Sequence, residues 1–211
     1  MRVPPEGRND ELVRTVIEAF GRLEGYVTPR CVWGRFHIIH FDGGIELEGA
    51  YIYSNDIARL TAQNDECYIL AATLGHEVDR QISIAQQKNM LDGLALDACA
   101  SVRIDAFADQ FIKSEIAPGL REKEFLTSRF SPGYGDLPLE LQPQILTALN
   151  GEKLLGVYAT ASHLLNPMKS VTAVIGLADK PQAAKIRGCG ACALKGNCAY
   201  RERGISCVSA S

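Results

Sequence analysis

An arginine and a tyrosine lie close together in a segment rich in glycine and proline. Arg129 and Tyr134 belong to the stretch Arg129-Phe-Ser-Pro-Gly-Tyr-Gly135, whose glycines let a backbone approach a ligand closely. Arginine forms paired hydrogen bonds with a carboxylate, and a tyrosine ring offers an apolar face with a polar tip. The stretch therefore fits a polar small molecule that carries a carboxylate. The alternative is a plain turn with a surface arginine.

An acidic residue that could complement this arginine lies in a segment with helical periodicity, residues 89–114. Asp105 follows Asp97 by eight positions, so both carboxylates face one side of the expected helix. A carboxylate near Arg129 would hold the ammonium of an amino-acid ligand while the guanidinium holds its carboxylate. The alternative is an ordinary solvated helix position.

Four cysteines lie within the last 23 residues: Cys189, Cys192, Cys198 and Cys207. Residues 180–211 carry six basic and one acidic side chain, whereas residues 1–179 carry 16 basic and 24 acidic ones. Without an export signal, clustered thiols indicate a metal site rather than disulfides. Four thiolates suit a [4Fe-4S] cluster or tetrahedral zinc. The uneven spacing and the local positive charge favour iron–sulfur, with zinc and metal-free redox thiols as alternatives.

The loop around Arg129 resembles a motif of known enzymes. Residues 128–138, Ser-Arg-Phe-Ser-Pro-Gly-Tyr-Gly-Asp-Leu-Pro, are similar to the Arg-x-x-x-Gly-Tyr motif in the activation domain of cobalamin-dependent methionine synthase. Three further stretches, residues 71–80, 97–107 and 168–177, resemble the free-standing form of that family in the expected order. Together the matches reach across residues 30–178.

The resemblance implies a helmet-like α+β domain that holds S-adenosylmethionine against cobalamin. In that family, accidental oxidation to cob(II)alamin is reversed by one-electron reduction coupled to methyl transfer from S-adenosylmethionine. Carried over by position, Arg129 and Tyr134 would contact S-adenosylmethionine, and Asp105 would hold a cationic part of it. The backbone of Ser131 and Gly133 would line the same site. No general base is required, because a sulfonium methyl is already electrophilic and the protein mainly positions it.

The cobalamin would come from another chain, because the sequence lacks the Asp-x-His-x-x-Gly signature of a cobalamin-binding domain. The expected partner is a cobalamin-dependent methionine synthase or another corrinoid protein, with an electron donor such as flavodoxin or ferredoxin. Under this hypothesis the cysteine tail carries a cluster that relays the electron. Two rivals remain: an autonomous S-adenosylmethionine-dependent methyltransferase, and a non-catalytic docking protein stabilised by zinc.

Composition excludes several other classes. The chain has 211 residues, of which 46% are apolar and 22% charged, and these are ordinary values for a globular domain. A net charge of −3 gives no sign of nucleic-acid binding. We find no signal peptide and no run of 18 apolar residues, and therefore expect a cytoplasmic protein without membrane segments. The expected organisation is an S-adenosylmethionine-binding domain, residues 1–179, and a metal or iron–sulfur tail, residues 180–211.

Periodicity predicts an α+β fold with a twisted, mainly antiparallel sheet flanked by helices. In residues 89–114 we expect Leu91, Leu94, Ala98, Val102, Ala106 and Phe107 to face the core. His76 begins an expected helix, and His37 and His40 lie in an expected strand, so structural roles are favoured for all three. The expected helices are 9–23, a short one capped by Ser54, 76–87, 89–114 and 139–150, the last stopped by Gly151. The expected strands are 31–41, 45–53, the fully buried 67–74, 156–160 and 170–177.

Overall fold

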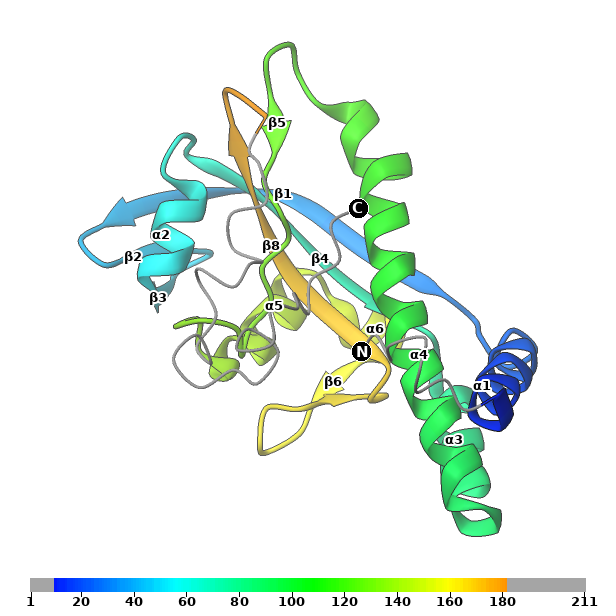
Figure 1. Cartoon of the computed structure of the whole chain (residues 1–211). Helices are drawn as coiled ribbons and strands as arrows, with labels where there is room; N and C mark the ends of the chain where they lie inside the picture. Colours follow the sequence, from blue (N-terminus) through cyan, green and yellow to red (C-terminus); the bar gives the residue numbers. More distant parts are fainter. Residues whose placement is uncertain (1–9, 182–211) are drawn as a thin grey trace, which may run out of the picture.

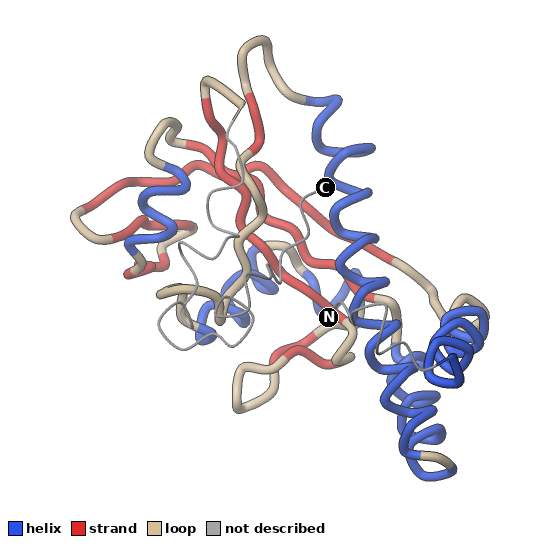
Figure 2. Tube along the Cα trace, in the orientation of Figure 1, coloured by secondary structure: helices blue, strands red, loops and turns tan. Residues whose placement is uncertain are grey.

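The computed structural model describes residues 10–181. Six strands form one sheet in the order β3-β2-β1-β4-β8-β5, and all neighbouring pairs are antiparallel (Figures 1 and 2). A short hairpin of β6 and β7 forms a second sheet. The antiparallel α+β prediction is therefore confirmed. The strands are β1 (Arg30–Phe41), β2 (Gly44–Leu47), β3 (Ala50–Tyr53), β4 (Glu66–Thr73), β5 (Phe125–Leu126), β6 (Tyr158–Ala159), β7 (Leu165–Asn166) and β8 (Ser170–Ala178).

Helices cover both faces of the sheet. One face packs against α1, α3 and α4, and the other against α2, α5 and α6. Figure 1 shows α4 running along the sheet beside β8. Each layer buries one set of alternating side chains from β4, which confirms that this strand is buried on both faces. The helices are α1 (Asp10–Leu23), α2 (Asn55–Thr61), α3 (His76–Lys88), α4 (Met90–Phe111), α5 (Gln142–Ala148) and α6 (Gly151–Leu155).

The predicted core face of α4 is wrong at five of its six positions. Leu91, Leu94 and Val102 are about half or more exposed, and Ala98 and Ala106 are exposed. Phe107 is half-buried and packs against the core, as predicted. The buried apolar residues of α4 are instead Ala95, Leu96, Cys99, Ala100, Ile104 and Ala108, which belong to the core that α4 shares with α1, α3 and the sheet. Apolar residues occur around much of the helix, so periodicity alone is consistent with two different core-facing sides of α4. The structure selects the one with small residues, which let α4 lie close to its neighbours.

Two boundaries also differ from prediction. Residues 45–53 form two strands, because Glu48 and Gly49 both have positive φ and make a tight hairpin turn between β2 and β3. Gly151 does not stop the preceding helix but begins α6. The left-handed residue between the two helices is Asn150, with φ of 53°, a conformation that asparagine tolerates better than most residues.

The predicted N-terminal cap of α2 is present. Ser54 accepts a hydrogen bond from the backbone N–H of Ile57 and caps α2 as predicted. After α4 the chain continues through a π-helical turn, Ile112–Ile116, and a 3₁₀ turn, Ala117–Gly119, before β5.

Within residues 10–181, none of the helices combines the length and apolar character needed to span a bilayer.

Candidate functional site

The segment that follows β5 brings Arg129 against α4. Phe130 forms an isolated bridge with Val174 of β8, and the two residues exchange backbone hydrogen bonds of 2.8 Å. This bridge directs the adjacent Arg129 into the interior, where its side chain is only 7% exposed. Its Nη2 donates to Asp105 at 2.5 Å and its Nε donates to Asp109 at 2.7 Å. Asp105, which was expected to lie near Arg129 and to bind a ligand with it, therefore forms a direct ion pair with Arg129 in this structure.

The guanidinium is held in its charged form. Burial lowers the pKa of Arg129, but hydrogen bonds with Asp109 and Asp105 outweigh this effect and raise the pKa above its ordinary value. Both carboxylates are about half exposed, with side-chain exposures of 61% for Asp105 and 49% for Asp109. A buried cation thus has acidic partners that water or a ligand can reach.

A cavity of about 270 Å³ adjoins this ion pair. It lies beside the first residues of β8, with α4 on one side and the Arg129 loop on the other. Asp105, Arg129, Ser131 and Tyr134 line it, so four of the five predicted binding residues meet there. Gly133 is outside the lining. Its φ is +90° and its N–H donates to the carbonyl of Leu137 at 2.9 Å, which closes the loop on itself.

The two cations of the cavity are buried, and its aromatic residue is exposed. Arg129 and Lys169 are its two cations, and their side chains are 7% and 10% exposed. Tyr134 and Met168 also line it, but they are 67% and 59% exposed. Among the described lining residues Tyr134 alone is aromatic. The arrangement suits a ligand with a charged end and a flatter, less polar end.

The far end of the loop is tied to α2. Asp136 accepts hydrogen bonds from Ser54 Oγ at 2.5 Å and from the backbone N–H groups of Asn55 and Asp56 at 2.8 and 3.1 Å. A Cβ atom at Gly135 would collide with the carboxylate of Asp56, and the φ of Gly135 is +55°, so a larger residue would have to displace Asp56 in a backbone conformation that favours glycine. Burial opposes the charge of Asp136, but the hydrogen bonds from Ser54 and the α2 terminus lower its pKa overall.

Sequence reasoning missed two residues of the site. Asp109 lies four positions after Asp105, a spacing that places both on one helix face and could have suggested it. Lys169 lies in the stretch that carried the family resemblance, but nothing in its spacing indicated a role. Its Nζ lies 2.9 Å from Asp97 Oδ1, so Asp97 pairs with this lysine rather than with Arg129.

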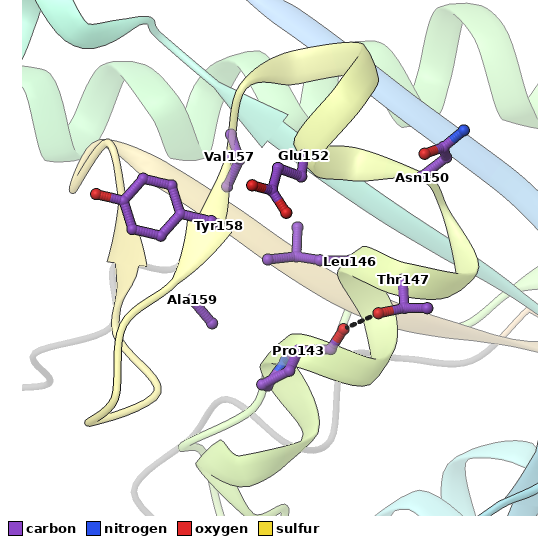
Figure 3. Close-up of a pocket in the computed structure, with 8 residues that line it drawn as sticks. All are labelled: Pro143, Leu146, Thr147, Asn150, Glu152, Val157, Tyr158 and Ala159. Atoms are coloured by element: carbon purple, nitrogen blue, oxygen red, sulfur yellow. Dashed lines mark hydrogen bonds between the residues drawn. The ribbon is translucent and has the colours of Figure 1, made fainter.

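A second cavity contains none of the predicted residues. It has a volume of about 330 Å³ and lies between α5, α6 and β6 (Figure 3). Glu152 is its one charged lining residue, and Thr147 is already bonded to the carbonyl of Pro143 at 2.9 Å. A cavity with one carboxylate and no cation is poorly suited to a carboxylate ligand. The smaller cavity at Arg129 remains the better candidate.

Cysteine and histidine residues form no metal site in the part of the chain that the structure describes. Burial raises the pKa values of Cys31 and Cys67 to about 12, which disfavours the thiolate that metals and electrophiles require. His76 begins α3, and His37 and His40 lie in β1, where they were predicted. The predicted metal ligands Cys189, Cys192, Cys198 and Cys207 lie outside the described residues.

The fold matches a solved structure. The chain superimposes on a structure described as "Crystal Structure of the MetH Reactivation Domain bound to AdoHcy" with a TM-score of 0.62 and 18% sequence identity. The match covers 93% of this chain and 73% of that one. Neither a protein-family model nor a curated protein matches the sequence. The chain therefore has the α+β fold of a reactivation domain, as the sequence motifs predicted.

Proposed function

We propose that this chain binds S-adenosylmethionine in the cavity beside Arg129. The observation that carries the proposal is the buried guanidinium paired with half-exposed carboxylates at the wall of that cavity. An amino-acid ligand can replace the contact between Arg129 and Asp105: its carboxylate then bonds to Arg129 and its ammonium to Asp105. The similar structure was solved with AdoHcy bound, and AdoHcy is the product left when S-adenosylmethionine gives up its methyl group.

The remaining predicted contacts have separate roles under this proposal. Tyr134 supplies an exposed aromatic face at the mouth of the cavity, where the adenine would lie against it. Ser131 is 8% exposed and lines the buried part. Gly133 acts indirectly, because its left-handed conformation shapes the turn that presents Tyr134.

The reaction we propose is methyl transfer that reactivates a corrinoid enzyme, in the manner of methionine synthase reactivation. The partner would be a cobalamin-dependent methionine synthase or another corrinoid protein, which brings the cobalamin. An external donor such as flavodoxin or ferredoxin supplies one electron, and the reduced cobalt accepts the methyl group while S-adenosylhomocysteine leaves. The chain contributes binding and orientation of the donor.

The cysteine tail completes the proposal as an electron relay. Cys189, Cys192, Cys198 and Cys207 would hold a [4Fe-4S] cluster, with zinc as the alternative. Iron, sulfide and zinc analysis of protein purified without oxygen distinguishes the two. We expect a brown, iron-containing protein that loses its colour in Cys192→Ala; stoichiometric zinc in a colourless protein would contradict the cluster.

The function is tested by binding and by methyl transfer in the same preparation. We expect calorimetry to detect S-adenosylmethionine binding, and labelled methyl to reach an oxidised corrinoid partner only when a reductant is present. Failure to bind S-adenosylmethionine would contradict the proposal. Methyl transfer to another acceptor without corrinoid would favour an autonomous methyltransferase, and zinc without ligand affinity would favour a docking protein.

A further inference from the structure

A lysine ammonium lies at the cavity with part of its bonding capacity unused. Lys169 precedes β8, and its side chain is 10% exposed. Its Nζ lies 2.9 Å from Asp97 Oδ1 and donates to Ser101 Oγ at 2.9 Å. An ammonium has three N–H donors, and within the described residues these two groups are its partners. Lys169 and Ser101 line the cavity, whereas Asp97 does not.

The backbone around Lys169 is fixed from both sides. The N–H of Met168 donates to Asp79 Oδ2 at 2.5 Å, which ties this segment to α3. The carbonyl of Lys169 accepts from the N–H of Leu74 at 2.9 Å and so extends the pairing of β4 with β8. The ammonium is therefore held in place before any ligand arrives, which lowers the entropy lost on binding.

Stability alone is a poor explanation for this ammonium. A buried ion pair adds little net stability, because desolvation offsets much of the attraction. The side chain of Asp97 is 39% exposed, so it stays hydrated if Lys169 is replaced. An apolar side chain of similar length could fill the same space without the desolvation cost. Contact with a ligand explains a cation at the border of a cavity better than stabilisation of the fold does.

We propose that Lys169 forms a carboxylate subsite in this cavity, with Ser101 holding the ammonium in place: the hydroxyl of Ser101 accepts from Lys169 and donates to the carbonyl of Asp97 at 3.1 Å. Arg129 reaches the cavity from the loop after β5 and Lys169 reaches it from the start of β8, so two elements recognise one ligand carboxylate. The subsite makes the protein select ligands with a free α-carboxylate. This inference rests on the proposed binding of S-adenosylmethionine and names the residue that determines its specificity.

The test compares S-adenosylmethionine with decarboxylated S-adenosylmethionine, which keeps the sulfonium, the amine and the adenosine but lacks the carboxylate. Calorimetry is performed on the full chain and on the variants Lys169→Met and Lys153→Met. Lys153 is an exposed lysine of α6 and serves as the matched control. Thermal unfolding of each variant monitors the fold.

Three results are expected together. The unaltered protein prefers S-adenosylmethionine over the decarboxylated ligand by at least about tenfold, the effect of one hydrogen bond to a charged group. Lys169→Met keeps only the part of that preference that Arg129 supplies, because the carboxylate ligand alone binds more weakly. Lys153→Met retains it.

Other results overturn the subsite in recognisable ways. Three results would each exclude a carboxylate contact by Lys169 and leave the proposed function standing. In the first, Lys169→Met keeps the full preference; in the second, it loses the same affinity for both ligands; in the third, the unaltered protein shows no preference. Absence of binding by either ligand to the unaltered protein would remove the proposed function itself, and the subsite with it. If Lys169→Met fails to fold, Lys169→Gln replaces it and is judged by the same preference.

Discussion

Two buried arginines in this chain are paired with carboxylates in opposite ways. Arg35 on β1 is 18% exposed, and its partners Glu66 and Glu124 are only 27% and 12% exposed. Arg129 is 7% exposed, but Asp105 and Asp109 are about half exposed. In the first cluster the arginine and its two acidic partners are largely withdrawn from water, whereas in the second only the cation is withdrawn.

The details of the Arg35 cluster match a structural role. Arg35 forms two hydrogen bonds with Glu124, at 2.6 and 3.0 Å, and a third with Glu66 at 2.6 Å. Its guanidinium also lies 5.5 Å from the ring centre of Tyr68. The cluster joins β1 and β4 to the segment before β5. If Arg129 binds S-adenosylmethionine as we propose, the exposure of its acidic partners, more than the burial of the arginine, is what distinguishes it from the Arg35 ion pair.

The largest expected effect is on stability at Arg35. Arg35→Met should lower the free energy of unfolding by about 3 kcal/mol, the lower end of the range for breaking a buried ion pair, because Glu66 keeps Arg121 at 3.1 Å. Urea denaturation measures the change. The affinity for S-adenosylmethionine should stay the same. If Arg35→Met were as stable as the parent, the Arg35 cluster would not have the structural role that separates it from the Arg129 cluster.

Acid should remove the same stabilisation. Hydrogen bonds from Arg35 lower the pKa values of Glu66 and Glu124 in the folded state. Groups with a depressed folded pKa contribute stability above their unfolded pKa, about 4.3, and lose it as the pH falls through the folded pKa. The stability difference between the parent and Arg35→Met should therefore shrink below about pH 4. Urea denaturation from pH 6 to pH 3 checks this, and parallel curves would contradict it.

The smaller effect is on binding at Arg129. Arg129→Met keeps the aliphatic stem but loses the guanidinium, so S-adenosylmethionine should bind more weakly by about 1.5–3 kcal/mol. Unfolding should change by about 1 kcal/mol or less, because the freed carboxylates remain hydrated. Calorimetry and urea denaturation measure the two effects. Arg103→Met, which removes an α4 ion pair with Glu24 at 2.8 Å, is the control; equal ligand affinity in both variants would remove Arg129 from the site.

Sequence reasoning predicted the parts of the fold that short-range chemistry decides. Ser54 caps α2, and the fully apolar stretch of β4 is buried on both faces, because a cap and a continuous apolar run each have a local cause. The core face of α4 was not predictable in the same way. Leu94 and Leu96 are equally apolar, and only packing against α1, α3 and the sheet leaves the first exposed and buries the second.

The candidate site shows the same division. Arg129 and Asp105 were found because their types and the family motif pointed to complementary charges, and the fold brings them within 2.5 Å. Lys169 was missed because its position depends on the pairing of β4 with β8 and on Asp79 of α3. Those contacts join residues far apart in the sequence, and a single sequence carries no local sign of them.

The two anchors of the Arg129 loop have a consequence for its length. Phe130 is bridged to Val174 at one end, and Asp136 is bonded to the start of α2 at the other. Five residues join these two fixed points on separate elements. An inserted or deleted residue would therefore break one of the two anchors or distort the loop between them. Apart from the two glycines and Tyr134, exchanges of side chain in this stretch should be tolerated far better than any change in the number of residues, and homologous chains that keep this pocket should keep the spacing from Arg129 to Asp136.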